Sequence, residues 1–135
     1  MTKTDVFFDT NILLHAFDKD AVKTAHAVGL LAVGGTISVQ VLNEFANVAL
    51  RKWKRAWPEI VEMLDAVRAT CDVIPVTVAV HERGLAYAQR YQFALYDSMI
   101  VAAAVSAGCT TLYSEDMNAG QVIDGLTIRN PYAAA

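Results

Sequence analysis

The chain has 135 residues, of which 55% are hydrophobic and 19% are charged, and its formal net charge is -3. This length is typical of one domain with a sizeable core, and this composition excludes a disordered chain. The slightly acidic balance argues against a protein that coats nucleic acid nonspecifically, because such proteins are basic. We therefore expect one domain that spans residues 1–135.

Cysteine usage and the N-terminal segment indicate a soluble, cytoplasmic protein. Cys71 and Cys109 are far apart and form no CxxC motif, so they are expected to be buried thiols. The start of the chain lacks the apolar region of a signal peptide, and the apolar run 99–105 is too short to cross a bilayer. The high apolar fraction suggests that a partner covers some surface. The histidines match no metal-binding motif and are expected to be ordinary surface or rim residues: His15, His26 and His81.

Short apolar runs and helical patterns alternate along the chain. In chain order the sequence predicts a strand at 6–8, helices at 12–17 and 21–33, a strand at 36–39, helices at 40–55 and 58–69, a strand at 73–74, helices at 77–90 and 96–107, and strands at 110–113 and 126–128. Alternation of this kind is typical of an α/β domain with a mostly parallel sheet. We expect a three-layer α/β/α fold with four or five strands.

Four acidic residues from distant parts of the sequence are predicted to meet at one edge of this sheet. Asp9 follows the first strand and Asp116 follows the strand at 110–113, so both lie at the carboxyl edge, where such sheets carry their sites. Glu44 lies in the first turn of the helix that leaves the second strand. Asp97 opens a helix that begins at the same edge and runs back to the sheet. The four carboxylates should therefore converge.

Each acid taken singly also has an ordinary structural explanation. Asp9 could form an Asx turn, Asp97 could favour a helix N-terminus, Asp116 could be a turn residue and Glu44 a solvated rim residue. Taken together, unpaired carboxylates repel one another, so such a cluster usually has a compensating cation. Ligands that offer only oxygen suit a hard ion. We therefore hypothesise that the four acids bind Mg²⁺ or Mn²⁺.

Four blocks of sequence resemble a known family. The stretches VFFDTNILL at 6–14, SVQVLNEF at 38–45, YDSMIVAAA at 96–104 and LYSEDM at 112–117 are similar, in order, to the signature blocks of PIN domains. Within that family the resemblance is to the VapC-type toxin ribonucleases of bacterial toxin–antitoxin pairs. It implies that the metal is bound by Asp9, Glu44, Asp97 and Asp116.

The resemblance also implies an activity and partners. A VapC-type protein is expected to be an endoribonuclease that hydrolyses RNA with a metal-activated water, leaves 5′-phosphate products, forms a homodimer and is inhibited by a cognate antitoxin. Asn11 and Ser114 match polar positions of the family, and with Thr10 they are expected to orient the carboxylates through hydrogen bonds. Glu115 is not a fixed position of the family, and its role stays open.

Two other functions stay open on the sequence. One is a non-catalytic module of the same fold that binds RNA or protein. The other is a phosphatase with an aspartyl nucleophile. Asn11 stands where many such phosphatases have a second Asp, and the chain has no lysine after Lys54. Both observations disfavour the phosphatase.

Two further features have alternative interpretations. Four cations surround Trp53 at the end of a predicted helix, either as a solvated helix C-terminus or as a contact for RNA or an acidic partner: Arg51, Lys52, Lys54 and Arg55. Tyr96 is expected in the core, or lining the site beside Asp97.

Overall fold

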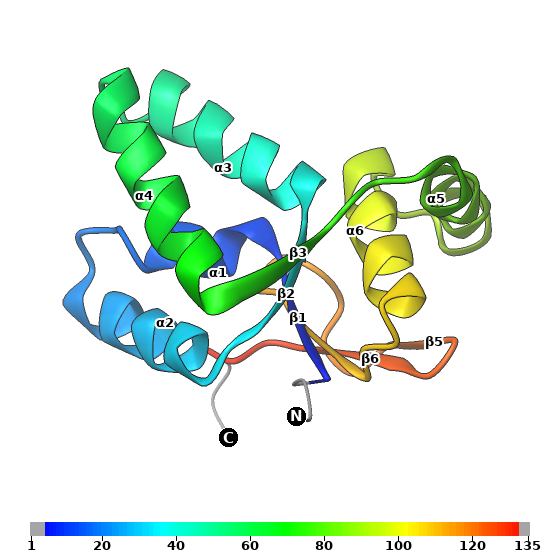
Figure 1. Cartoon of the computed structure of the whole chain (residues 1–135). Helices are drawn as coiled ribbons and strands as arrows, with labels where there is room; N and C mark the ends of the chain where they lie inside the picture. The colour runs from blue at the N-terminus through cyan, green and yellow to red at the C-terminus, as the bar shows by residue number, and fades with distance from the viewer. Residues whose placement is uncertain (1–4, 133–135) are drawn as a thin grey trace.

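A central sheet of six strands organises the molecule (Figure 1). The computed structural model describes residues 5–132. The strands are β1 (Val6–Phe8), β2 (Gly35–Ser38), β3 (Cys71–Ile74), β4 (Thr111–Tyr113), β5 (Val122–Ile123) and β6 (Leu126–Arg129). The helices are α1 (Thr10–His15), α2 (Ala21–Val33), α3 (Val39–Arg51), α4 (Trp57–Thr70), α5 (Val78–Tyr91) and α6 (Leu95–Ser106).

The strand order β3-β2-β1-β4-β6-β5 confirms the predicted fold class. All neighbouring strands pair in parallel except β5 and β6. The predicted count of four or five strands was too low, because β5 has only two residues and gives no pattern in the sequence. It pairs with β6 across a tight turn in which Asp124 and Gly125 both have positive φ, as short hairpin turns require.

Helices cover both faces of the sheet, with α1 to α4 on one side and α5 and α6 on the other (Figure 1). Helix α6 is enclosed on its whole circumference, and its residues 98–104 are all buried. A side chain at Gly84 of α5 would place its Cβ 2.5 Å from the sulfur of Met99. The glycine therefore allows α5 to pack closely on α6. Because α6 is enclosed between α5 and the sheet, it is apolar on every face.

Several predicted boundaries are corrected by the structure. The helix predicted at 40–55 ends at Arg51, because the chain turns through Lys54 with φ of 56° and the ring of Trp53 packs edge-on against Phe45. Helix α1 begins two residues earlier than predicted, because the carboxylate of Asp9 caps it. The remaining predicted elements agree to within a few residues, and the expected burial of both cysteines is confirmed.

None of the helices within residues 5–132 combines the length and the apolar character needed to cross a membrane.

Candidate active site

The sheet places two loops side by side at its carboxyl edge. Strands β1 and β4 are neighbours, with Phe8 opposite Tyr113, and the backbone N–H of Asp9 donates to the carbonyl of Tyr113 at 2.9 Å. Asp9 therefore lies beside the segment Ser114–Asp116 that follows β4. The chain reverses the order of its strands at β1, and α/β proteins bind ligands at such a switch point.

Asp9 is the most enclosed of the four acids, with 4% of its surface exposed. Its carboxylate accepts hydrogen bonds from Thr10 N and Ser114 Oγ, each at 2.7 Å, and from Asn11 Nδ2 at 3.3 Å. All three donors are neutral. Burial raises the pKa of Asp9 to about 6, although the bonds from Ser114 and Thr10 oppose this, and the charges of Asp97 and Glu44 raise it further.

Glu44 faces the same point from helix α3. Its Oε1 accepts from Thr10 Oγ1 at 2.8 Å and its Oε2 accepts from Gln40 Nε2 at 2.9 Å. The helix begins at Val39, one residue earlier than predicted, so Glu44 lies in the second turn and not in the predicted first turn. The bond from Thr10 links this carboxylate to the residue that follows Asp9.

Asp97 and Asp116 complete the group. Asp97 lies in the first turn of α6, where burial and then the charges of Glu44 and Asp116 raise the pKa of its carboxyl. Asp116 is exposed and accepts from Asn11 Nδ2 at 3.2 Å. The amide of Asn11 therefore bridges Asp116 and Asp9.

The structure thus brings Asp9, Glu44, Asp97 and Asp116 into mutual electrostatic range without a compensating cation. No lysine, arginine or histidine within residues 5–132 forms an ion pair with any of them. The side chains of the described residues, as they stand, also form no complete group of three metal ligands. The donors are nevertheless all oxygen, they carry excess negative charge and one of them is buried, which fits a hard divalent cation.

Glu115, the neighbour of Asp116, is in a different setting. Its two oxygens lie 2.8 Å from Lys23 Nζ and 2.8 Å from His15 Nε2. The bond from Lys23 lowers the pKa of the Glu115 carboxyl, and His15 adds to this effect. The Glu115 backbone N–H donates to Asn11 Oδ1 at 3.2 Å. These contacts fix the loop that carries Asp116.

Tyr132 packs on this ion-paired group. Its ring lies edge-on to His15 and His26, each with centroids 5.0 Å apart, and Lys23 Nζ lies 5.5 Å from the ring centroid. The expectation that His15 is an ordinary surface or rim residue was therefore incomplete. Lys23 and His15 are 92 and 100 residues from Glu115 in sequence, so only the fold reveals their pairing.

The basic residues around Trp53 lie at the other end of α3 from the acids. From Glu44 to Lys52 the helix axis advances about 12 Å. Arg51 Nε donates to Asn47 Oδ1 at 3.0 Å, and Arg55 pairs with Glu59 at 3.3 Å. An open cavity of about 580 Å³ lies at this end of the helix, and the residues that line it include Lys19, Lys52, Trp53, Lys54 and Arg55. This basic surface is thus separate from the acidic cluster.

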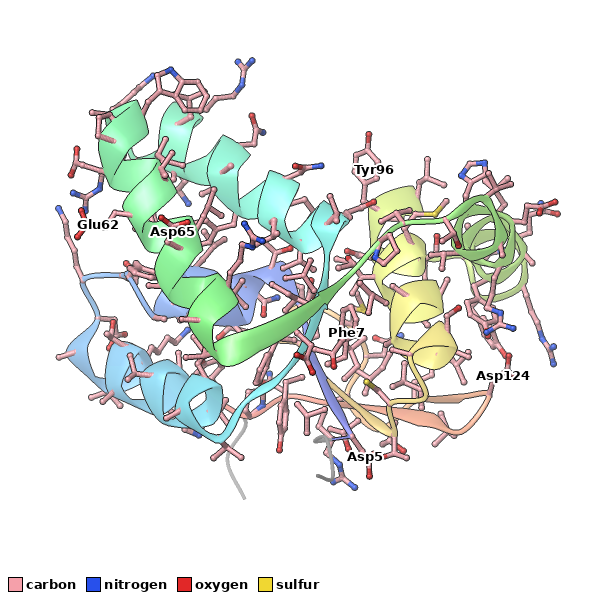
Figure 2. All side chains as sticks on the ribbon, in the orientation of Figure 1. Asp5, Phe7, Glu62, Asp65, Tyr96 and Asp124 are labelled. Carbon is pink, nitrogen blue, oxygen red and sulfur yellow. The ribbon has the colours of Figure 1, made fainter. Side chains whose placement is uncertain are left out.

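Tyr96 is not in the core. Its side chain is 65% exposed, so the core interpretation was wrong, and it projects from the end of α6 nearest to α3 (Figure 2). The tyrosine lines a cavity that also includes Glu44, in line with the alternative that it borders the site.

Comparisons with known proteins identify the family and the fold. A family model described as PIN domain matches residues 6–122. No curated protein matches the chain. Similar solved structures include a toxin–antitoxin complex from Klebsiella pneumoniae, with a TM-score of 0.73, 24% identity and coverage of 96% of this chain and 99% of that one.

Two further solved structures are similar. VapC20 from Mycobacterium tuberculosis, described as a sarcin-ricin loop cleaving toxin, has a TM-score of 0.68 and 19% identity over 82% of this chain and 89% of that one. DNA-bound VapBC from Salmonella typhimurium has a TM-score of 0.70 and 19% identity over 97% of this chain and 99% of that one. The TM-scores show a shared fold, and at identities this low the similarity shows the fold alone.

Proposed function

This chain belongs to the PIN domain family, and on that premise we propose that it is a metal-dependent endoribonuclease of the VapC type, the toxin of a toxin–antitoxin pair. The observation that carries the proposal is the convergence of four carboxylates without a cation at the switch point of the sheet. Similar solved structures support it, because they include a toxin described as cleaving the sarcin-ricin loop.

Asp9, Asp97 and Asp116 would hold Mg²⁺ or Mn²⁺, with Glu44 as a further ligand or as the group that positions the attacking water. When bound, such an ion lowers the pKa of a water and stabilises charge on a phosphodiester. Burial is the largest cause of the raised pKa of Asp9 and of Asp97, and the charges of the neighbouring carboxylates raise both further, which supports a site that is stabilised by a cation. A divalent ion would relieve that repulsion, and it would let an acidic protein accept a polyanion.

Three neutral side chains would keep the carboxylates in place. Ser114 Oγ and Asn11 Nδ2 donate to Asp9 Oδ2, and within residues 5–132 the only donor to its Oδ1 is the N–H of Thr10. The hydroxyl of Thr10 holds Glu44. Because each bond comes from a neutral group, it fixes an orientation without neutralising the negative charge that the ion requires.

The proposal includes partners and a location. Toxin–antitoxin complexes among the similar structures support an antitoxin partner, whose basic side chains could reach the acidic cluster. A homodimer and a cytoplasmic location belong to the same proposal. Helix α2 leaves three large apolar side chains exposed, which favours a surface that a partner covers: Val22, Val28 and Val33.

The test is cleavage of a labelled RNA by the purified protein in Mg²⁺, in Mn²⁺ and in EDTA. We expect cleavage only with a divalent ion, and 5′-phosphates on the products. Asp65→Asn on the exposed face of α4 is the matched control and should cleave like wild type. A folded protein that binds RNA but does not cleave it in either ion would instead favour the non-catalytic module.

A further inference from the structure

A cavity of about 360 Å³ opens beside the acidic cluster, between the start of α3 and the first turn of α6. Glu44 belongs to both the cavity and the cluster, so the two are continuous. The cavity's other walls are two valines, three amides and one phenol: Val39, Val76, Gln40, Asn43, Asn47 and Tyr96. The cavity is therefore an extension of the site toward helix α3.

The lining chemistry indicates the kind of group that fits. None of the residues that line the cavity is a lysine, arginine or histidine, so it is not built for a phosphate. Amides offer both donors and acceptors, valines offer apolar walls and a tyrosine offers a flat ring. An unpaired nucleobase needs this combination, because it stacks on one face and hydrogen-bonds along its edge.

Tyr96 supplies the stacking surface. Its side chain is 65% exposed, although it stands at the start of the most enclosed helix of the molecule. Gln40 Nε2 donates to the Tyr96 carbonyl at 3.2 Å and to Glu44 Oε2 at 2.9 Å. The same amide therefore ties the backbone under the ring to a carboxylate of the acidic cluster, and Figure 2 shows the ring projecting on the side of α3.

Asn43 and Asn47 supply the polar edge. They lie one helical turn apart on the exposed side of α3. Asn47 Oδ1 already accepts from Arg51 Nε at 3.0 Å, which orients the amide, and its two N–H groups donate to no described residue. Within residues 5–132 the side chain of Asn43 forms no hydrogen bond, so both its donor and its acceptor are available.

We infer that this cavity binds one unpaired nucleobase of the RNA next to the phosphodiester that is cleaved, by stacking on Tyr96 and hydrogen bonding to Asn43 and Asn47. The inference rests on the proposed ribonuclease function and adds a base-binding subsite to it. One stacked base typically contributes about tenfold or more in affinity.

The experiment measures RNA affinity separately from cleavage. A fluorescent single-stranded RNA is titrated in Ca²⁺, a hard divalent ion that can neutralise the acidic cluster, with wild type, Tyr96→Ala, Tyr96→Phe and Asn43→Ala, and a gel checks that the RNA stays intact. The same RNA is made with one abasic position moved along its length. We expect Tyr96→Ala to weaken binding about tenfold and Tyr96→Phe to stay within about twofold, because phenylalanine keeps the ring. Leu95→Ala, an exposed neighbour outside the cavity, is the control.

Combining each abasic position with Tyr96→Ala identifies the base that stacks on the tyrosine. One abasic position should weaken binding to wild type by about the same factor as Tyr96→Ala, and should add nothing in that variant. Single-turnover rates at saturating enzyme should change little in Tyr96→Ala. Equal affinity of wild type and Tyr96→Ala, or independent effects of the abasic site and the mutation, would overturn the inference. So would a Tyr96→Ala change in oligomeric state without a change in affinity, which would assign this surface to a second copy.

The outcomes also separate this inference from the proposed function. Abasic-sensitive binding through Tyr96 without cleavage in Mg²⁺ or Mn²⁺ would retain the subsite and reject the nuclease. Cleavage by a protein whose RNA affinity is unchanged in Tyr96→Ala would retain the nuclease and reject the subsite. An RNA that neither binds nor is cleaved would reject both.

Discussion

Glu115 and Asp116 are adjacent in sequence and belong to opposite electrostatic environments. Glu115 has a lysine and a histidine within 2.8 Å, and its pKa is lowered. Among the described residues, the carboxylate of Asp116 accepts a hydrogen bond only from the neutral amide of Asn11, and its charge raises the pKa of Asp97. The same loop therefore contributes one acid to a neutralised group and the next to a cluster that lacks positive charge.

The contrast separates two functions that acidic residues can have. The paired acid joins α1, α2 and the loop after β4, which is a structural function. The acids of the cluster repel one another, and although Asp9 also caps α1, no lysine or arginine within residues 5–132 pairs with any of them, which favours a function in binding a cation. The candidate site differs from its surroundings because its acids have no neighbouring cation among the described residues. The number of acids alone would not distinguish it.

The largest expected effect is on cleavage. Asp9→Asn should lose at least about a hundredfold in single-turnover rate, the scale of one lost electrostatic contact in a transition state. Asp97→Asn and Asp116→Asn should resemble it, and the double variant of Asp9 and Asp97 should be little worse than either single one. Glu115→Gln should stay within a few-fold of wild type. Equal losses in Glu115→Gln and Asp9→Asn would remove the distinction.

A smaller effect is expected on stability without metal. The folded-state pKa of Asp9 is raised to about 6, above the value of about 3.9 for an unfolded chain. Folding is therefore favoured by protonation, and this stability is present below about pH 4 and lost as the pH rises through about 6. Asp9→Asn in EDTA should raise the free energy of unfolding at pH 7 by about 1–3 kcal/mol.

Thermal melts in EDTA between pH 4 and 8 measure this gain. It should shrink toward pH 4, whereas Asp65→Asn should show no such trend. A correctly folded Asp9→Asn that is less stable than wild type at pH 7 would contradict the destabilisation that we assign to the buried charge of Asp9 and its acidic neighbours.

The ion pair of Glu115 should have a modest effect, because Lys23 and Glu115 are partly exposed to solvent. Glu115→Gln and Lys23→Met should each lower the melting temperature by a few degrees at most. Exchanging the two residues, as Lys23→Glu with Glu115→Lys, should recover part of that loss. If Glu115→Gln melts like wild type and the exchange gains nothing, the pair does not fix the loop.

The smallest effect is expected at the basic surface. Lys52→Ala should weaken RNA binding mildly and reduce its dependence on salt, because it removes one phosphate contact. The rate at saturating enzyme should not change. Binding curves at several salt concentrations measure this, and identical salt slopes for wild type and Lys52→Ala would exclude Lys52 from the RNA path.

The sequence predicted those parts of the fold that depend on local pattern. Asp9 follows a buried strand and Asp97 opens a helix, and the rule for parallel sheets then places both at one edge. The two-residue strand β5 was missed because it is too short for any alternation. The end of α3 was missed because it depends on the packing of Trp53 against Phe45, a tertiary contact.

Within the site, long-range pairing was beyond the sequence. Charge counts could not show that Glu115 pairs with Lys23, 92 positions away, while Asp116 has no such cation among the described residues. The exposure of Tyr96 was also hidden, because tyrosines occur both in cores and at surfaces and the neighbouring helix is apolar on every face. A tyrosine at the first turn, before the enclosed part of that helix, was the available signal.

Calorimetric titration of Mn²⁺ into wild type, Asp9→Asn and Glu115→Gln tests the central claim most directly, because it needs neither RNA nor cleavage. The account predicts that wild type and Glu115→Gln bind the ion with similar affinity and that Asp9→Asn binds it at least about tenfold more weakly. Binding that is equal in all three proteins, or absent from folded wild type at millimolar Mn²⁺, would contradict the assignment of the four unpaired acids as a metal site.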